Sequence, residues 1–261
     1  NFSSPLERAA RIHGEFSKIQ PFLSGNGPTA RLMMNYPLVA AGYPPLSIQK
    51  AQQAEYFQEA GEAPLRENLA AGLLLLLGYD GSQPFQDPFC GSGTIAIEAA
   101  LIALNRAPGL DRSFDAQRWA FLPAKVWMDA SDEAMDKEFH GHYDIWGGDV
   151  DPRAVAIARD NARKAGVEDV VRFEVADAGK FHRESAYGQL VTNPPYGERL
   201  GNLEQAGQLE RTLAARLREN PVAGTYVITA DADFEHNFGK KASRRRKLYN
   251  GMIPCQLYMY F

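Results

Sequence analysis

The sequence predicts an α/β fold in which a doubly wound, mostly parallel sheet carries an antiparallel hairpin at its C-terminal end. From about residue 60 onward, short apolar strands alternate with helical segments. This alternation is typical of parallel strands joined by crossover helices. Near the end, Asn250-Gly251 separates two apolar stretches, and this dipeptide strongly favours a two-residue hairpin. We expect one large domain over residues 56–261 and an appendage over residues 1–55.

Punctuation residues set the expected limits of the elements. Pro64 in the first turn and Gly78 just past the end frame one helix, and Asp151 is placed to cap another. Residues 105–142 look irregular, with Trp119, Phe121 and Trp127 available to pack them onto the body. The expected helices are 64–78, 94–103, 151–166 and 203–219. The expected strands are 84–87, 143–148, 170–175, 189–192, 225–229, 246–249 and 254–260.

Composition narrows the class of protein. Hydrophobic residues make up 45% and the net charge is −4, which fits a soluble enzyme and argues against nucleic-acid binding by bulk charge alone. The longest apolar stretch, Leu69–Leu77, is far short of the roughly 20 residues that span a bilayer. The two cysteines, Cys90 and Cys255, lack metal-like spacing. We therefore expect no membrane and no metal, and a reducing cytoplasm as the location.

A glycine-rich turn, Asp87–Thr94, follows the first of these strands. Gly91 and Gly93 let the backbone pass close to a ligand, and the amides of the next helix offer donors. An acid four residues before the first glycine would repel a dinucleotide pyrophosphate. It suits S-adenosylmethionine, which carries an ammonium and a sulfonium. Taken alone, the motif is also compatible with a tight turn that binds nothing.

Two further carboxylates follow the next two strands. Asp149 is placed to accept hydrogen bonds from ribose hydroxyls. Asp177 is either an acceptor for an adenine amino group or an ordinary loop aspartate. Because ligands of such sheets bind at the carboxyl ends of the strands, these acids and the glycine-rich turn are expected at one edge.

The tetrapeptide Asn193-Pro194-Pro195-Tyr196 follows the fourth strand. Methylation of an exocyclic amine needs two acceptors that hold the N–H bonds and point the nitrogen at the methyl group. The Asn193 side-chain oxygen and the Pro194 carbonyl can serve, while the prolines stiffen the turn. Tyr196 offers an aromatic face to an extruded base, and such stacking contributes ~1–3 kcal/mol. The pattern predicts an amino-methyltransferase acting on a nucleic-acid base.

In this order the motifs resemble the class I, Rossmann-like methyltransferases, and within them an RNA methylase family that includes the bacterial 23S rRNA guanine-N2 methyltransferases. The resemblance covers about residues 60–261. Its most specific pieces are Gly61–Glu67, Asp87–Thr94, Asn105–Leu110, Asp149–Ala154, Thr192–Leu200 and Lys247–Gly251, with Cys255 after them.

The resemblance implies direct methyl transfer, with inversion, from S-adenosylmethionine to guanine N2 in RNA, in particular 23S rRNA. Together with the motifs it gives three sets of residues. The catalytic set is Asn193, Pro194 and Tyr196. The cofactor-binding set is Pro64, Asp87, Cys90, Gly91, Gly93, Asp149, Asp177 and Asn193. The nucleic-acid-binding set is Tyr196, Arg199, Arg244, Arg245 and Arg246.

The chain departs from the family pattern near its N-terminus. The family usually carries an RNA-binding THUMP domain, and residues 1–55 have room for its trailing edge only. The family also tends to be basic just before the Gly-Glu-Ala-Pro motif, whereas residues 53–59 of this chain are acidic. An RNA contact at residues 53–59 is therefore in doubt.

A basic run precedes the hairpin, with six cations among residues 240–247 and no acid. Two interpretations are equally compatible with it: phosphate contact beside the target base, or a solvated loop. Cys90 and Cys255 are interpreted as packing residues, because nothing near either suggests a lowered thiol pKa. Catalysis through a cysteine nucleophile is therefore not expected.

Several other functions share these features. The acceptor pair serves adenine N6 in DNA and guanine N2 in tRNA as well as rRNA. A nicotinamide-dependent oxidoreductase could use the same fold, although Asp87 and the missing third glycine weigh against it. An RNA-binding module with a decayed site is disfavoured by the intact tetrapeptide. The oligomeric state does not follow from the sequence.

Overall fold

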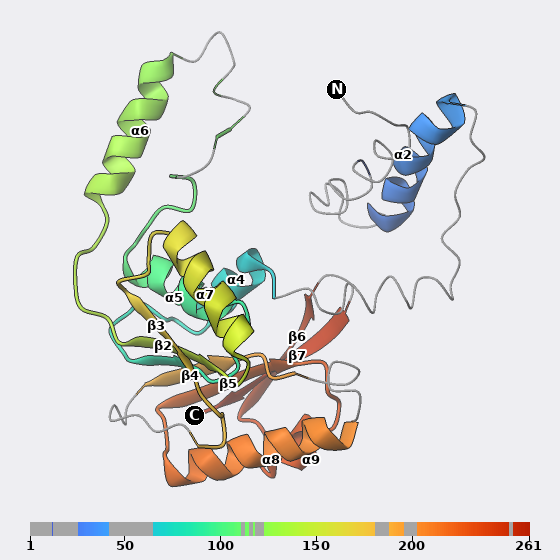
Figure 1. The fold of residues 1–261 in the computed structure, drawn as a ribbon, viewed down its shortest axis with the longest axis vertical. Coiled ribbons are helices and arrows are strands. Elements are labelled where there is room, and N and C mark those ends of the chain that lie inside the picture. The colour runs from blue at the N-terminus through green and yellow to red at the C-terminus, as the bar shows by residue number, and fades with distance from the viewer. Residues whose placement is uncertain are drawn as a thin grey trace. The chain divides into compact units, whose positions relative to one another are not determined.

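The computed structural model describes residues 12, 26–41, 65–110, 113–114, 117, 123–180, 188–195, 203–250 and 253–261. The chain divides into two compact units, Asn1–Ala60 and Gly61–Phe261. Helix α2 (Asn26–Ala40) belongs to the first unit. The sheet belongs to the second unit (Figure 1). So do the glycine-rich turn and every predicted motif that follows it in the sequence.

The described residues of the second unit form a seven-stranded sheet in the order β3-β2-β1-β4-β5-β7-β6. Strands β1 to β5 run parallel, whereas β7 is antiparallel to both β5 and β6. The parallel sheet with a terminal antiparallel pair is thus confirmed. The strands are β1 (Phe85–Asp87), β2 (Ile145–Asp149), β3 (Val171–Val175), β4 (Gln189–Thr192), β5 (Gly224–Thr229), β6 (Arg244–Asn250) and β7 (Ile253–Tyr260).

Helices cover both faces of this sheet (Figure 1). One face carries α4 (Glu67–Leu76), α5 (Thr94–Ala103) and α7 (Pro152–Lys164) over a core that includes Phe85, Val191 and Ile228. The other carries α8 (Leu203–Glu219) and α9 (Phe234–Phe238), whose apolar residues pack on Val227 and Tyr258. Alternate residues of β5 therefore enter two different cores, as the two-residue repeat of a strand requires.

Three expectations about helices need correction. Helix α4 begins at Glu67, because Arg66 is still extended, and Pro64 lies outside the described residues. The stretch expected to be irregular contains α6 (Ala124–Asp136), a helix without a buried residue. Of the three aromatic residues expected to pack this stretch onto the body, only Trp127 is described, and its ring stacks on Phe114 with the centroids 5.9 Å apart. Helix α9, only five residues long, gave no periodic signal.

The structure of the basic run contradicts one of its two interpretations, that of a solvated loop. Strand β6 begins at Arg244, two residues before the predicted start, so Arg244 to Lys247 lie in regular structure. The solvated-loop reading is wrong for these four residues. Asn250 is the last residue of β6 and pairs with Ile253, so the two residues between the strands are 251 and 252, one position later than the predicted Asn250-Gly251 turn. Both lie outside the described set.

Within the described part of the chain, no helix combines the length and apolarity that a membrane crossing needs. Nor do the described side chains gather three or more histidine, cysteine, aspartate or glutamate residues in a group that could hold a metal ion.

Candidate active site at the carboxyl edge

The parallel strands bring the predicted site residues to one edge of the sheet. Asp87 is the last residue of β1, Asp149 the last of β2, and Asn193 follows the last residue of β4. These strands are neighbours in the order β2-β1-β4. Asp87 is paired with Gly147, two residues before Asp149. The sequence motifs that lie far apart along the chain thus meet at the carboxyl ends of three adjacent strands.

The glycine-rich turn crosses from β1 to α5 with two residues in the left-handed region. Gly91 has φ 52° and Gly93 has φ 86°. A Cβ on Gly93 would lie 2.7 Å from the Phe173 ring and 3.0 Å from the Ala158 methyl group, so packing excludes a side chain there. A Cβ on Gly91 would meet nothing within 4 Å. Gly93 therefore seats the turn on α7 and β3, while Gly91 faces open space.

Asp149 organises the turn from the neighbouring strand. One carboxylate oxygen accepts a hydrogen bond from the Gly91 amide at 3.0 Å, and the other accepts from the Asp151 amide at 2.9 Å. The side chain is only partly buried. A carboxylate offers about four acceptor positions, so Asp149 keeps capacity for ligand hydroxyls. Asp151 caps α7 by accepting from the Arg153 amide at 2.9 Å, which confirms the predicted cap.

Asp87 lies beneath the turn and joins it to the segment that leads into the tetrapeptide Asn193-Pro194-Pro195-Tyr196, the predicted acceptor motif. Its side chain is 1% exposed, and one oxygen accepts from the Phe89 amide at 3.2 Å and from the Thr192 hydroxyl at 2.6 Å. The other oxygen is buried and has no hydrogen-bond partner among the described residues. Burial raises the pKa of Asp87 to about 7, against the opposing effect of these hydrogen bonds and with the added repulsion of Asp149.

The two cysteines are buried and remain thiols, as the packing interpretation requires. Burial, reinforced by the charges of Asp87 and Asp149, raises the pKa of the Cys90 thiol. A thiol with a raised pKa is a poor nucleophile. The Cys90 amide donates to the Gly148 carbonyl at 2.9 Å, so this residue helps to fix the turn against β2.

Asp177 has its carboxylate engaged locally. One oxygen accepts from the Gly179 amide at 2.8 Å, and the other lies 3.4 Å from the Lys180 ammonium. These are the contacts of an aspartate that shapes its own loop. The exposed carboxylate follows β3 at the same edge as Asp149, and its role toward an adenine stays a prediction.

The acceptor motif directly follows β4. Asn193 is partly buried, Pro194 is buried and Pro195 is partly buried, and all three lie outside helices and strands. Thr192, which is fully buried, anchors the start of this segment through Asp87. Three predicted residues, Tyr196, Arg199 and Pro64, lie outside the described residues, and their roles stay predictions.

The basic strand β6 forms the free edge of the same sheet. Arg244, Arg245 and Arg246 are exposed, and Arg245 pairs with Glu235 of α9 at 3.3 Å. The register places Thr192 level with Val227, Tyr258 and Arg245 on the three following strands. At ~4.8 Å per strand spacing, β6 therefore runs roughly 14 Å from the acceptor motif.

A comparison with protein families decides which family the chain belongs to. The model described as "RMKL-like, methyltransferase domain" matches residues 55–259. The chain belongs to this family. A second model, of the Fic/DOC family, matches residues 1–38, a stretch too short to establish a family for the first unit.

Relatives of this RMKL-like domain agree with the assignment. YpsC of Bacillus subtilis is 39% identical over 79% of this chain and 54% of its own length. The ribosomal RNA large subunit methyltransferase K/L of Shewanella baltica is 39% identical over 80% of this chain and 30% of its own length. The chain thus spans about half of the first relative and under a third of the second.

Solved structures share the fold of the RMKL-like domain. SMU.472, determined in complex with S-adenosylhomocysteine, is 39% identical with a TM-score of 0.73 over 77% of this chain and 53% of its own. A protein of Listeria monocytogenes described as a predicted N6-adenine-specific DNA methylase is 43% identical with a TM-score of 0.72, over 77% and 52% of the two chains.

Two residues of this RMKL-like domain were not given roles by the sequence. Thr192 entered only as part of a motif, yet its hydroxyl joins the turn after β1 to the segment after β4. Its place, as the last strand residue before the acceptor asparagine, is the signal that could have identified it. Tyr249 is 56% exposed near the end of β6, with the Lys247 ammonium 5.4 Å from its ring centroid.

Proposed function

We propose that this chain transfers a methyl group from S-adenosylmethionine to the exocyclic N2 amine of a guanine in RNA, in particular 23S rRNA. One observation carries the proposal. The Asn193-Pro194 acceptor pair emerges from β4 beside the glycine-rich turn and is anchored to it by the 2.6 Å Thr192–Asp87 hydrogen bond. Membership of a methyltransferase family gives that juxtaposition its chemistry.

The residues at the turn fit the cofactor. The open space in front of Gly91 is where a ligand can approach the backbone, and Asp149 next to it keeps free acceptor positions for ribose hydroxyls. Asp87, whose second oxygen has no hydrogen-bond partner in the described part of the chain, adds negative potential beneath the turn when it is ionised. That potential favours a cationic ligand and disfavours a pyrophosphate. The crystal complex of SMU.472 with S-adenosylhomocysteine supports the same choice.

The bound cofactor supplies a methyl group on a positively charged sulfur. The chain's own task is to hold the amine. In the proposal, the Asn193 side-chain oxygen and the Pro194 carbonyl accept its two N–H bonds, so that the nitrogen lone pair faces the methyl carbon. The N–C bond forms as the S–C bond breaks, and the amine proton leaves to solvent. Catalysis then comes from alignment, which contributes up to ~7–11 kcal/mol in well-oriented reactions.

The substrate assignment rests on the basic strand and on a relative. Arg244 and Arg246 are exposed cations without a carboxylate partner among the described residues, on the strand that borders the substrate half of the edge. Arginine pairs well with phosphate. The Shewanella baltica relative is named as a methyltransferase of large-subunit rRNA. Tyr196 and Arg199 complete the proposed RNA contacts beside the target base.

A second substrate has one observation in its favour. The Listeria monocytogenes neighbour is described as an adenine-specific DNA methylase, and the same acceptor pair can hold adenine N6. The basic strand suits either nucleic acid, because phosphate contacts carry no base identity. The identity of the methylated nucleoside therefore has to be measured.

We keep residues 1–55 as a proposed appendage, the trailing edge of a THUMP-type RNA-binding domain. Along the sequence, the boundary between the two compact units falls between Ala60 and Gly61. The RMKL-like match begins at residue 55. If the appendage contributes to RNA capture, a chain from which residues 1–55 are deleted should keep its cofactor affinity and lose RNA affinity.

Calorimetric titration tests the cofactor step. The full chain should bind S-adenosylhomocysteine and should not bind NAD at comparable concentrations. Asn193→Ala should lose methyl transfer to RNA even at saturating S-adenosylmethionine. Binding of NAD without S-adenosylhomocysteine would overturn the proposal in favour of an oxidoreductase.

A further inference from the structure

The hairpin formed by β6 and β7 extends beyond the carboxyl ends of the parallel strands. Thr229, the last residue of β5, pairs with Gln256 of β7, which in turn pairs with Lys247 of β6. Three further residue pairs follow in the hairpin, the last of them Asn250 with Ile253. At ~3.4 Å per residue, the hairpin therefore extends roughly 10 Å past the end of β5, on the substrate side of the edge.

Two exposed side chains of this hairpin lie on the sheet face that carries α8 and α9. Arg245 pairs with Tyr258, which belongs to the core beneath these helices, and Arg245 also binds Glu235 of α9 at 3.3 Å. Because alternate residues of a strand share a face, Lys247 and Tyr249 lie on this face as well. Helix α8 is the next described element after the acceptor motif. The chain thus continues from the acceptor motif into a helix on the face of Lys247 and Tyr249.

Lys247 and Tyr249 place a cation beside an aromatic ring. Tyr249 is 56% exposed, and the Lys247 ammonium lies 5.4 Å from its ring centroid. Neither β6 nor β7 contains an acidic residue, and no carboxylate of the described residues lies within ion-pair distance of Lys247. An exposed ring stacks on a base and a neighbouring cation binds its phosphate, which is how proteins hold single-stranded nucleic acid.

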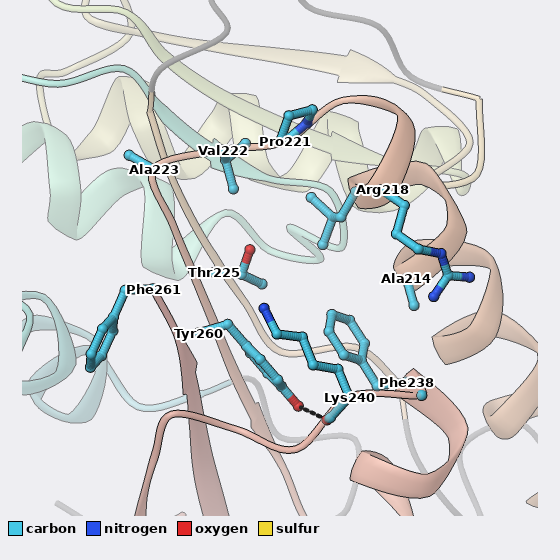
Figure 2. A pocket seen from close by; sticks show the side chains of 12 residues that line it. Ala214, Arg218, Pro221, Val222, Ala223, Thr225, Phe238, Lys240, Tyr260 and Phe261 are labelled. Atoms are coloured by element: carbon cyan, nitrogen blue, oxygen red, sulfur yellow. Dashed lines mark hydrogen bonds between the residues drawn. The ribbon is translucent and has the colours of Figure 1, made fainter.

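A cavity near the start of β5 has a similar composition and lacks this property. Its volume is about 360 Å³, and Arg218, Lys240, Phe238 and Tyr260 are among the residues that line it (Figure 2). The rings of Phe238 and Tyr260 pack against each other with their centroids 4.7 Å apart, and Phe234 stacks on Phe238 at 5.1 Å. Both lining rings belong to buried residues of the core. A base therefore finds an accessible ring at Tyr249 and not in the cavity.

The loop after β5 carries the opposite charge. It contains Asp231 and Asp233, and the Asp231 carboxylate accepts a hydrogen bond from the Asp233 amide at 2.8 Å. In the sheet order, β5 lies between β4, which leads into the acceptor motif, and the hairpin. Carboxylates repel phosphate. A phosphate of a strand that passes this edge is therefore favoured at Lys247, on the far side of the loop.

We propose that Tyr249 and Lys247 form a subsite for a nucleotide that flanks the target base. Its base stacks on the Tyr249 ring, and its phosphate binds the Lys247 ammonium. The inference rests on the proposed RNA substrate. Since β6 runs roughly 14 Å from the acceptor motif, the subsite contributes to RNA binding and not to alignment of the amine. Stacking and phosphate contact of this kind carry little base identity.

Titration with labelled RNA tests this proposal. The full chain is titrated with a fluorescein-labelled single-stranded 16-nucleotide RNA, a length at the upper end of the ~4–16 nucleotides covered by single-strand binding modules. Tyr249→Leu removes the ring, whereas Tyr249→Phe keeps it. The control is Phe139→Leu, which removes a ring of nearly equal exposure, 57%, from the segment that precedes β2.

Loss of the Tyr249 ring should weaken RNA binding roughly 5- to 150-fold, the range expected when one stacked base is lost. Tyr249→Phe and Phe139→Leu should bind as the parent does. Because these side chains are exposed, all three variants should unfold at the urea concentration of the parent. Equal binding by Tyr249→Leu and the parent would overturn the subsite. So would an equal loss in Tyr249→Phe, because a hydroxyl contact would then replace stacking.

The phosphate contact is tested by salt. Lys247→Met keeps the apolar stem of the side chain and should lower the slope of log K against log salt by ~0.7, the contribution of one single-strand phosphate contact. Lys164→Met removes an exposed cation from α7 and should leave the slope unchanged. An unchanged slope in Lys247→Met would contradict the proposal. Displacement of the RNA by hexaglutamate as efficiently as by unlabelled RNA would also contradict it, in favour of an acidic peptide as the ligand.

Methyl transfer separates this subsite from the proposed function. With large-subunit rRNA as the substrate, Tyr249→Leu should raise KM while kcat at saturating RNA stays unchanged, because the subsite does not contact the reacting amine. If the parent methylates RNA and Tyr249→Leu keeps the KM of the parent, the subsite is wrong and the function stands. If the parent methylates no RNA, the proposed function fails on its own.

Discussion

The two halves of the carboxyl edge are built differently. In the cofactor half, at β2 and β1, carboxylates are tied to backbone amides: Asp149 to Gly91 at 3.0 Å and Asp87 to Phe89 at 3.2 Å. In the substrate half, from β4 to β6, a short proline segment is followed across the sheet by a strand whose arginines are exposed. The cofactor half is held by internal hydrogen bonds, whereas the substrate half presents exposed arginine side chains.

This difference teaches where stability and function separate. Substitutions in the cofactor half remove contacts that the fold uses, so they should change stability and cofactor affinity together. Substitutions in the substrate half remove groups with few internal partners, so they should change transfer or RNA affinity at nearly constant stability. The Thr192–Asp87 hydrogen bond is the described side-chain contact that joins the halves.

The largest effect is expected at the acceptor asparagine. Asn193→Ala removes one of the two groups that align the amine, and loss of a single positioned hydrogen-bonding group in an active site typically costs 10²–10³-fold, about 2.7–4 kcal/mol. We expect that loss in kcat at saturating S-adenosylmethionine and at unchanged unfolding free energy. Single-turnover rates with saturating RNA measure it. A variant within threefold of the parent rate would show that Asn193 does not hold the amine.

The two glycines of the turn should respond in different ways. Gly93→Ala places a Cβ 2.7 Å from Phe173 at φ 86°, and strain plus overpacking should lower the unfolding free energy by about 3 kcal/mol. Gly91→Ala has open space at φ 52°. Its unfolding free energy should fall by about 1 kcal/mol. Its cofactor affinity should also fall, because the new methyl group fills the space through which a ligand approaches the backbone. Urea denaturation and calorimetry measure the two quantities. The comparison fails if Gly91→Ala is the less stable variant.

Asp87 predicts a pH dependence of stability. Its pKa rises from 3.8 to about 7 on folding, so between these values the folded protein keeps a proton that the unfolded chain has released. Stability contributed by this group should therefore fall as pH rises from about 4 to 7, by at most about 1.4 kcal/mol per pH unit, and level off outside that window.

Asp87→Asn keeps an acceptor for the Thr192 hydroxyl without the charge. The difference in unfolding free energy between this variant and the parent should grow with pH across the window, measured by urea titration at several pH values. Glu98 and Glu210 also have pKa values raised to about 7 by burial, but they are common to both proteins and cancel. A difference that is constant from pH 4.5 to 7.5 would show that Asp87 ionises normally.

The smallest effect is expected on the basic strand. Arg246→Ala removes an exposed cation, so its unfolding free energy should stay within ±0.5 kcal/mol of the parent. Its RNA-binding slope against salt should fall by ~0.7. Arg163→Ala, on the exposed face of α7, is the matched control and should leave the slope unchanged. An Arg246 variant that unfolds more easily and binds RNA normally would reverse the contrast between the two halves.

The sequence predicts the sheet and the cofactor half well, because both depend on local signals. The signals come from residues close in sequence to the element that they predict: the strand alternation, the glycine pair and the Asp151 cap. Contacts made across the sheet have no such signal. The Thr192–Asp87 bond joins residues 105 positions apart. The edge location of Arg244 to Lys247 depends on the pairing order of β5, β7 and β6.

Helix α6 was missed although its apolar residues follow the helical repeat as clearly as those of α8, which the sequence predicted. None of its residues is buried. It is supported by local ion pairs such as Lys125–Asp129. The cavity between the end of α8 and the end of β7 has no sequence signal either, since its lining residues Arg218, Lys240 and Tyr260 come from separate elements.

Identification of the modified nucleoside tests the central claim most directly. The full chain is incubated with S-adenosylmethionine labelled in its methyl group and with separate total RNA and DNA, and the digested nucleosides are resolved by mass. The account predicts label in N2-methylguanosine from large-subunit rRNA, absent with Asn193→Ala. Label found only in DNA, or only as N6-methyladenosine, would contradict it.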